Sequence, residues 1–156
     1  MNNFLAKLKN TRLLAGIGIA GLILGTIFSY VDYSFISISL WDYLEGKIIL
    51  IIAIANLLFI FKDIVEKYVP SFFNTNIGKK VAEINNPKAS LVPTILAAAF
   101  ALYLTLKLDV SFKYYSLGFY SLWLGVICLV VYAIIHKKND DFQKIDFYLE
   151  IKIQLM

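Results

Sequence analysis

Residues 39–68 read SLWDYLEGKIILIIAIANLLFIFKDIVEKY, and the interpretation of this stretch decides the fold expected for the whole chain. Ser39 and Asp42 form an S-x-x-D pattern that is typical of a helix N-terminus, because their side chains can satisfy amides of the first turn. Pro70 follows the stretch and cannot continue a helix. The pattern therefore predicts a single helix that begins near Ser39 and ends before Pro70.

This helix is long and apolar enough to cross a membrane. No charged residue occurs between Ile48 and Phe61. A helix over residues 39–68 would extend about 45 Å, which exceeds the roughly 30 Å hydrocarbon core of a bilayer. We therefore predict a membrane helix whose last turns, residues 62–68, project into water.

The composition of the chain indicates an integral membrane protein. Of its 156 residues, 60% are hydrophobic, well above the usual content of a soluble domain. Four apolar runs are separated by short or moderate connections, at about residues 13–30, 44–61, 90–106 and 117–135. We therefore predict an all-α protein with an up-down four-helix transmembrane bundle over residues 1–138, in contact with the lipid bilayer.

The distribution of charge predicts the orientation of this bundle. Of the fifteen basic residues, twelve lie on one side of the predicted arrangement and three lie on the other. The twelve are Lys7, Lys9, Arg12, Lys62, Lys67, Lys79, Lys80, Lys88, Lys137, Lys138, Lys144 and Lys152, and the three are Lys47, Lys107 and Lys113. Because lysine and arginine accumulate in cytoplasmic loops, both termini are predicted to be cytoplasmic in a bacterial plasma membrane. The net charge of +4 is thereby explained without a nucleic-acid partner.

Small residues in the first apolar run predict close helix packing. Gly21 and Gly25 form a G-x-x-x-G pair, which allows a neighbouring backbone to approach closely. We favour packing within one chain, and the alternative is a homodimer face.

Two segments on the outer side alternate apolar and polar residues, as strands do. These segments are residues 32–38 and 106–113. They are predicted to pair as a small two-stranded sheet. Nearby aromatic residues are expected to support the sheet at the membrane interface: Trp41, Tyr43, Tyr114, Tyr115, Tyr120 and Trp123.

The connection over residues 69–88 is predicted to contain a short interfacial helix. Asn76 is placed to cap it, and Ile77, Val81 and Ile84 recur at helical spacing. Its basic face is interpreted as solvated, with an anionic headgroup or an acidic partner as the alternative.

The C-terminal tail, residues 139–156, has a two-residue period. Its apolar members are Ile145, Phe147, Leu149, Ile151, Ile153 and Leu155. This alternation predicts a cytoplasmic β-strand with an unpaired edge, which needs a partner strand. The partner is expected to be the same tail in a second subunit, giving a homo-oligomer, or a cytoplasmic protein.

Reactive groups are sparse in the sequence. The intramembrane polar residues of interest are Asn56, Thr105 and Ser121, and packing is the favoured role of Asn56. His136 and the single Cys128 have no ligand-like neighbours in sequence. We therefore predict no catalytic, cofactor or metal site, and no enzymatic activity.

The order of these features carries a resemblance. With the motifs Glu45-Gly46-Lys47 and Gly118-Phe119-Tyr120, the segment from about Leu13 to Lys138 resembles small uncharacterised four-span membrane proteins of Gram-positive bacteria. The resemblance implies the four-span fold and no particular activity.

Two functions are compatible with these features. The favoured one is a non-enzymatic membrane protein that acts as an oligomer or a partner-bound assembly, in toxin immunity or as a defence or sensing subunit. The alternative is an oligomeric ion channel or pore whose lumen is lined by Asn56, Thr105 and Ser121.

Overall fold

The computed structural model describes the backbone of residues 2–33, 35–84, 91–108 and 110–154, and the side chains of residues 11–33, 35–84, 91–108 and 110–136. Within these ranges the chain is mostly helical, with seven α-helices and one small antiparallel sheet. In chain order the elements are α1 (Asn2–Ile27), β1 (Ser29–Asp32), β2 (Ser37–Ser39), the 3₁₀ turn η1 (Leu40–Asp42), α2 (Leu44–Ile60), α3 (Lys62–Tyr68), α4 (Pro70–Phe73), α5 (Asn76–Glu83), α6 (Leu91–Leu108), the 3₁₀ turn η3 (Phe112–Tyr114) and α7 (Leu117–Gln154).

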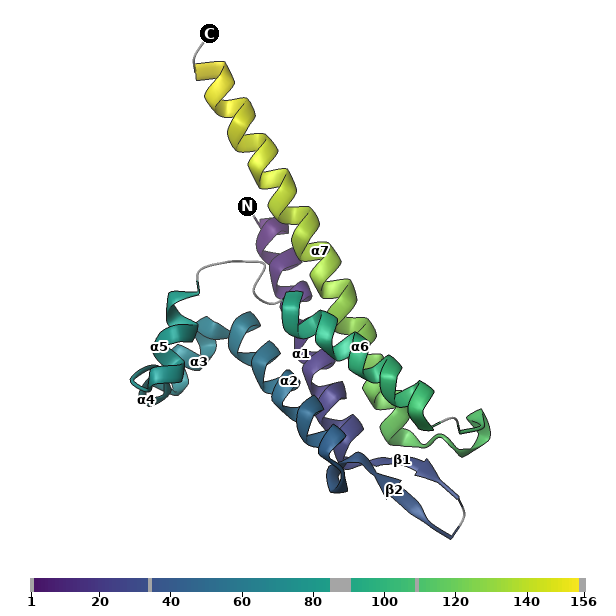
Figure 1. The fold of residues 1–156 in the computed structure, drawn as a ribbon. Helices are drawn as coiled ribbons and strands as arrows, with labels where there is room; N and C mark the ends of the chain where they lie inside the picture. Colours follow the sequence, from purple (N-terminus) through teal and green to yellow (C-terminus); the bar gives the residue numbers. More distant parts are fainter. Residues whose placement is uncertain (1, 34, 85–90, 109, 155–156) are drawn as a thin grey trace.

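The four long helices pack against one another in a ring, in which each helix contacts two neighbours. α1 contacts α2 and α7, α2 also contacts α6, and α6 contacts α7. Figure 1 shows these helices side by side, with the two strands at one end and α3, α4 and α5 to one side of the other end. We call the end of the bundle with the two strands the hairpin end. We call the opposite end the extension end, because α7 continues beyond the bundle at that end.

Two of these helices have the length and apolarity needed to cross a membrane. They are α6 and the part of α7 from Leu117 to His136, and α2 with α3 forms a third candidate if the bent pair is taken as one span. The apolar part of α1, Thr11–Ile27, is shorter. The apolar runs therefore occur as helices close to the predicted positions, and the charged residues of α2 and α6 lie in their terminal turns.

The single helix predicted over residues 39–68 is wrong at its start and is interrupted at Phe61. Ser39 caps η1, where its Oγ accepts from the Trp41 amide, and α2 begins only at Leu44. At the other end α2 stops at Ile60, and α3 leaves at 89°.

Long-range contacts explain the bend. In the bent arrangement Arg12 Nη1 lies 2.8 Å from Asp63 Oδ2, and Lys62 Nζ donates to the Ala82 carbonyl oxygen at 2.6 Å. The predicted end before Pro70 is confirmed, because Pro70 begins the new helix α4.

The predicted short helix in the 69–88 connection is confirmed as α5, with a different cap. Thr75 precedes the helix, and its Oγ1 accepts from the Gly78 amide at 3.1 Å. Val81 is buried, whereas Ile77 remains exposed. The apolar residues of α5 therefore do not all meet protein.

A two-stranded sheet exists on the predicted side of the bundle, but its strand pairing differs. β2 pairs with β1, immediately upstream, so the predicted strand 32–38 is divided between the end of β1 and the start of β2. Residues 106–108 instead continue α6, and among the described residues Tyr115 forms an isolated bridge to Val31. A local hairpin closes a much shorter loop than the predicted pairing would, and extending a helix requires no new nucleation.

The predicted C-terminal strand is wrong for the residues that the structure describes. α7 is one continuous helix of 38 residues to Gln154, and it includes Ile145, Phe147, Leu149, Ile151 and Ile153; Leu155 lies outside the described residues. The tail extends a helix that is already formed, so each added residue gains a backbone hydrogen bond without a new nucleus. An edge strand would require a partner strand first.

Candidate functional site

Glycines bring the backbones of α1 and α7 into direct contact. A Cβ placed on Gly21 would lie 2.7 Å from the Gly125 Cα, and one on Gly25 would lie 2.7 Å from the Leu122 Cβ. In turn, a Cβ on Gly125 would lie 2.7 Å from the Gly18 carbonyl oxygen. The α1–α7 interface is also the most extensive between elements. In this structure, therefore, Gly21 and Gly25 face a helix of the same chain.

Asn56 of α2 forms a buried polar contact with α6. Its side chain is 0% exposed, its Nδ2 donates to the Ile52 carbonyl oxygen at 3.0 Å, and its Oδ1 accepts from Thr94 Oγ1 at 3.0 Å. Thr94 is also buried. The amide is thus satisfied inside the bundle, where an unpaired polar group would be costly.

A double-mutant cycle should detect this contact. We expect Asn56→Leu and Thr94→Val to show a coupling of about 0.6–1.7 kcal/mol in the free energy of unfolding, because each change removes one half of the same hydrogen bond. The measurement is reversible unfolding in mixed micelles. Asn56→Leu combined with Thr105→Val is the control, because no hydrogen bond joins those side chains. Strictly additive effects for the Asn56 and Thr94 pair would contradict the prediction.

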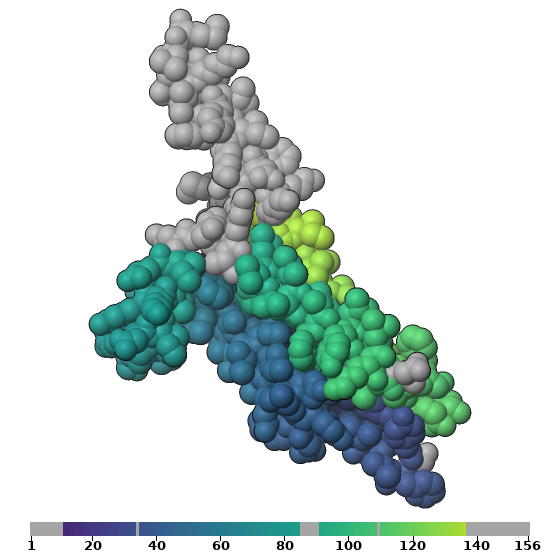
Figure 2. Space-filling model, in the orientation of Figure 1, coloured from purple at the N-terminus to yellow at the C-terminus, as the bar shows by residue number. Residues whose placement is uncertain are grey.

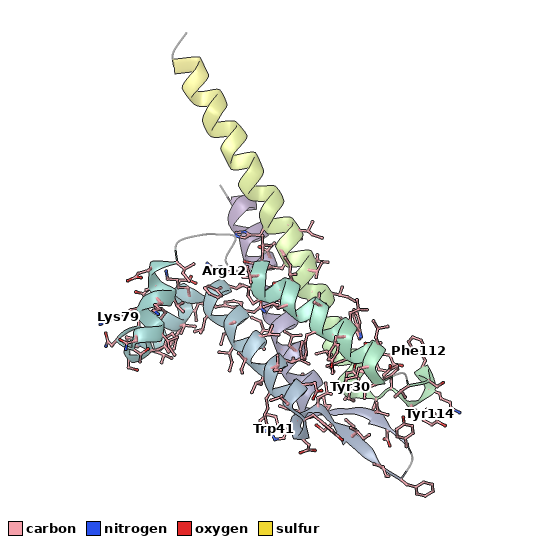
Figure 3. All side chains as sticks on the ribbon, in the orientation of Figure 1. Arg12, Tyr30, Trp41, Lys79, Phe112 and Tyr114 are labelled. Carbon is pink, nitrogen blue, oxygen red and sulfur yellow. The ribbon has the colours of Figure 1, made fainter. Side chains whose placement is uncertain are left out.

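Tyr30 organises an aromatic cluster at the hairpin end. Its ring meets Tyr115 edge-on at a centroid distance of 5.9 Å and Phe119 at 5.5 Å, and Tyr115 stacks on Phe119 at 3.8 Å. Figure 3 shows Tyr30 between the helices, with Trp41, Phe112 and Tyr114 nearer the edge of this end. Aromatic pairs of this kind contribute about 0.5–1.5 kcal/mol each beyond burial.

A shift of register places Tyr30 in this cluster. Ser29 pairs with Ser39 and Val31 pairs with Ile38, so Tyr30 is an additional residue on β1. An extra residue interrupts the alternation of a strand. As a result both Tyr30 and Val31 are completely buried.

Tyr30 and Trp123 share a polar partner on α6. The Tyr30 hydroxyl lies 3.5 Å from Thr105 Oγ1, and Trp123 Nε1 donates to the same oxygen at 3.2 Å. Thr105 itself donates to the Ala101 carbonyl oxygen at 2.9 Å. Tyr30 lies in β1, outside the apolar helices, and burial raises the pKa of its phenol from 10 to about 12.

Ion pairs mark the two ends of the bundle. Arg12 and Asp63 join α1 to α3 at the extension end, and Lys107 and Glu45 join α6 to α2 at the hairpin end. The Arg12 and Asp63 side chains are largely exposed, so this pair contributes at most about 1 kcal/mol.

The polar residues singled out from the sequence do not converge on one lumen. Asn56 contacts α6 through Thr94, Thr105 belongs to the Tyr30 cluster, and half-buried Ser121 lies along the glycine contact between α1 and α7. Because Asn56 is completely buried and hydrogen-bonded, it does not line a lumen between subunits in this conformation.

The sequence reasoning missed Tyr30, Thr94 and Gly125 as the partners that hold these contacts together. Gly125 had a local signal, because a glycine in an apolar helix marks close approach of another backbone. Thr94 and Tyr30 had none that identifies a partner. Thr94 is 38 residues from Asn56, and Tyr30 is 75 residues from Thr105.

The described side chains contain no cluster of three or more His, Cys, Asp or Glu residues that could hold a metal, and each buried side-chain nitrogen or oxygen among them has a hydrogen-bond partner. The contacts described above hold the helices in place relative to one another. Comparisons with protein-family models, curated proteins and solved structures found no match.

Proposed function

We propose that this chain is a non-enzymatic membrane subunit that self-assembles through the C-terminal extension of α7, residues 137–154. The observation that carries the proposal is the continuous helix of 38 residues, whose last part extends well beyond the other elements in Figure 1. A helix that continues beyond its own bundle can offer a face to a partner helix.

The sequence of the extension supports a helical contact. Phe142, Ile145, Leu149 and Ile153 recur at spacings of three and four, so the helical backbone places these positions along one side. A stripe with this spacing is the usual seam between packed helices. Assembly, which the sequence suggested through strands, is accordingly proposed through helices.

The proposed orientation has four membrane-crossing helices and both chain ends in the cytoplasm of a bacterial cell. It is supported by the excess of lysine and arginine in the segments at the extension end. The bent pair α2–α3 and the apolar part of α1 supply the third and fourth crossings. Toxin immunity or a role as a defence or sensing subunit is the physiological context that we propose.

The seam is tested by paired substitutions in the full chain. We expect the protein in mild detergent to have a mass above that of one chain, and Ile145→Ser with Leu149→Ser to reduce it to a monomer. Gln143→Ser with Glu150→Ser is the matched control, because it introduces the same two serines on another side of the helix. Light scattering coupled to gel filtration measures the masses. A monomeric unmodified protein, or equal masses for both variants, would overturn the proposal.

A further inference from the structure

An apolar groove lies between α6 and α7, in the half of the bundle toward the extension end. Its volume is about 450 Å³. The residues that shape it are Ile95, Ala98, Ala99 and Leu102 of α6, with Ala133 and Ile134 of α7. In Figure 2, α6 lies on the near face of the molecule, and α7 emerges beside its N-terminal turns.

Hydrocarbon forms nearly all of the groove wall. Thr94 also contributes to the lining, but its hydroxyl is donated to Asn56 within the bundle. Ala99 leaves open the space that a larger side chain would fill, whereas Ile95 and Ile134 at the rim are 65% and 62% exposed. The groove is therefore open toward the surface that would face lipid, and its lining favours a purely apolar occupant.

The dimensions match one hydrocarbon chain. From Leu91 to Leu102 the groove follows α6 for about 16 Å, roughly half the 30 Å hydrocarbon core, which is the depth of one leaflet. A neighbouring helix of this length, about 10 Å across, would occupy roughly 1,200 Å³. The groove has less than half the volume of such a helix and the length of one leaflet, which suits a single hydrocarbon chain lying along α6.

Basic residues follow at the end of the groove. The turn of α7 after Ile134 carries His136, Lys137 and Lys138. Lysines beside an apolar site between membrane helices are an arrangement that favours anionic headgroups. We propose that the groove binds one acyl chain of an anionic phospholipid, with the headgroup at the turn formed by residues 136–138.

Binding in the groove is independent of α7 self-assembly, and only the choice of leaflet rests on the proposed orientation. The test uses native mass spectrometry of the full chain in detergent, with dioleoyl phosphatidylglycerol and dioleoyl phosphatidylcholine as separate probes. We expect phosphatidylglycerol to be retained more tightly, by about fivefold per lysine.

Two variants distinguish binding of the acyl chain from binding of the lipid headgroup. Ala99→Leu should reduce retention of both lipids about tenfold, because the new side chain occupies the groove. A tenfold reduction corresponds to about 1.4 kcal/mol in binding free energy. Lys137→Gln with Lys138→Gln should reduce only the retention of phosphatidylglycerol. Ala20→Leu is the control, because Ala20 is an exposed alanine of α1 outside the groove.

A second measurement does not depend on filling the groove. Ile134→Trp is introduced into a Trp41→Phe and Trp123→Phe background. Phosphatidylglycerol with brominated chains should quench the fluorescence of this tryptophan more strongly than that of Leu24→Trp in the same background, because Leu24 is an exposed residue of α1. Equal quenching at both positions, equal effects of Ala99→Leu and Ala20→Leu, or equal retention of both headgroups would overturn the proposal. The serine variants of the extension should leave lipid retention unchanged, so the two proposals can fail separately.

Discussion

Replacing Gly125 with alanine is expected to lower the free energy of unfolding by about 1–3 kcal/mol, although alanine is the better helix former. The new methyl group would meet the Gly18 carbonyl oxygen and the Leu22 amide nitrogen, both at 2.7 Å. These are backbone atoms, which cannot rotate away as a flexible side chain can. The two helices must therefore separate along their most extensive interface, with loss of packing on both sides of the contact.

Gly16→Ala is the matched control for this prediction. Gly16 also lies within a helix, but its added Cβ would meet only the Phe61 Cζ, at an ordinary distance of 3.7 Å. The same gain in helix propensity, up to about 1 kcal/mol, should then appear as stabilisation. Chemical unfolding in micelles, followed by circular dichroism, measures both variants. If Gly125→Ala proved as stable as Gly16→Ala, the close contact of α1 with α7 would be refuted.

Replacing Tyr30 with alanine is expected to cost about 3–5 kcal/mol, the range for removing a large buried ring. Tyr30 is 0% exposed and contacts the rings of both Tyr115 and Phe119. Tyr30→Phe keeps the ring and should cost only about 0.5–1.5 kcal/mol, because it removes the hydroxyl alone. Tyr33→Ala is the control at a partly exposed neighbour, and its effect should be smaller than that of Tyr30→Ala.

Tryptophan fluorescence reports this loss at the site itself. Trp123 donates to Thr105, which the Tyr30 hydroxyl also approaches. In a Trp41→Phe background, Tyr30→Ala should shift the Trp123 emission to longer wavelength, because water reaches the indole. An unshifted spectrum together with wild-type stability would show that Tyr30 does not organise this cluster.

Continuous apolar runs and small-residue patterns were sufficient to predict the main helices. The apolar parts of α6 and α7 occur within a few residues of the predicted spans, because long uncharged segments have few alternatives to helix. The short helix α5 was also predictable from Val81 and its neighbours at helical spacing. These signals are local, and each lies within a single element.

The errors arose where the outcome depends on distant residues or on competition between two local structures. Nothing at Phe61 identifies a bend, since the contact between Arg12 and Asp63 joins residues 51 positions apart. In the tail, alternation indicated a strand, yet residues such as Leu149, Glu150 and Lys152 are also good helix formers. Continuity with α7 then decided the outcome. The Tyr30 cluster escaped prediction because one additional residue in β1 changes which side chains face inward.

The right-angled turn after Ile60 also determines how closely other molecules can approach α2. Since α3 leaves α2 at 89°, the segment from Lys62 to Glu83 lies to one side of the end of α2 and does not continue in line with it. This segment forms a shelf that is joined to the bundle by the Arg12 and Asp63 pair. A neighbouring protein that approached this end of α2 from the same side would meet the shelf before it met the last turn of α2.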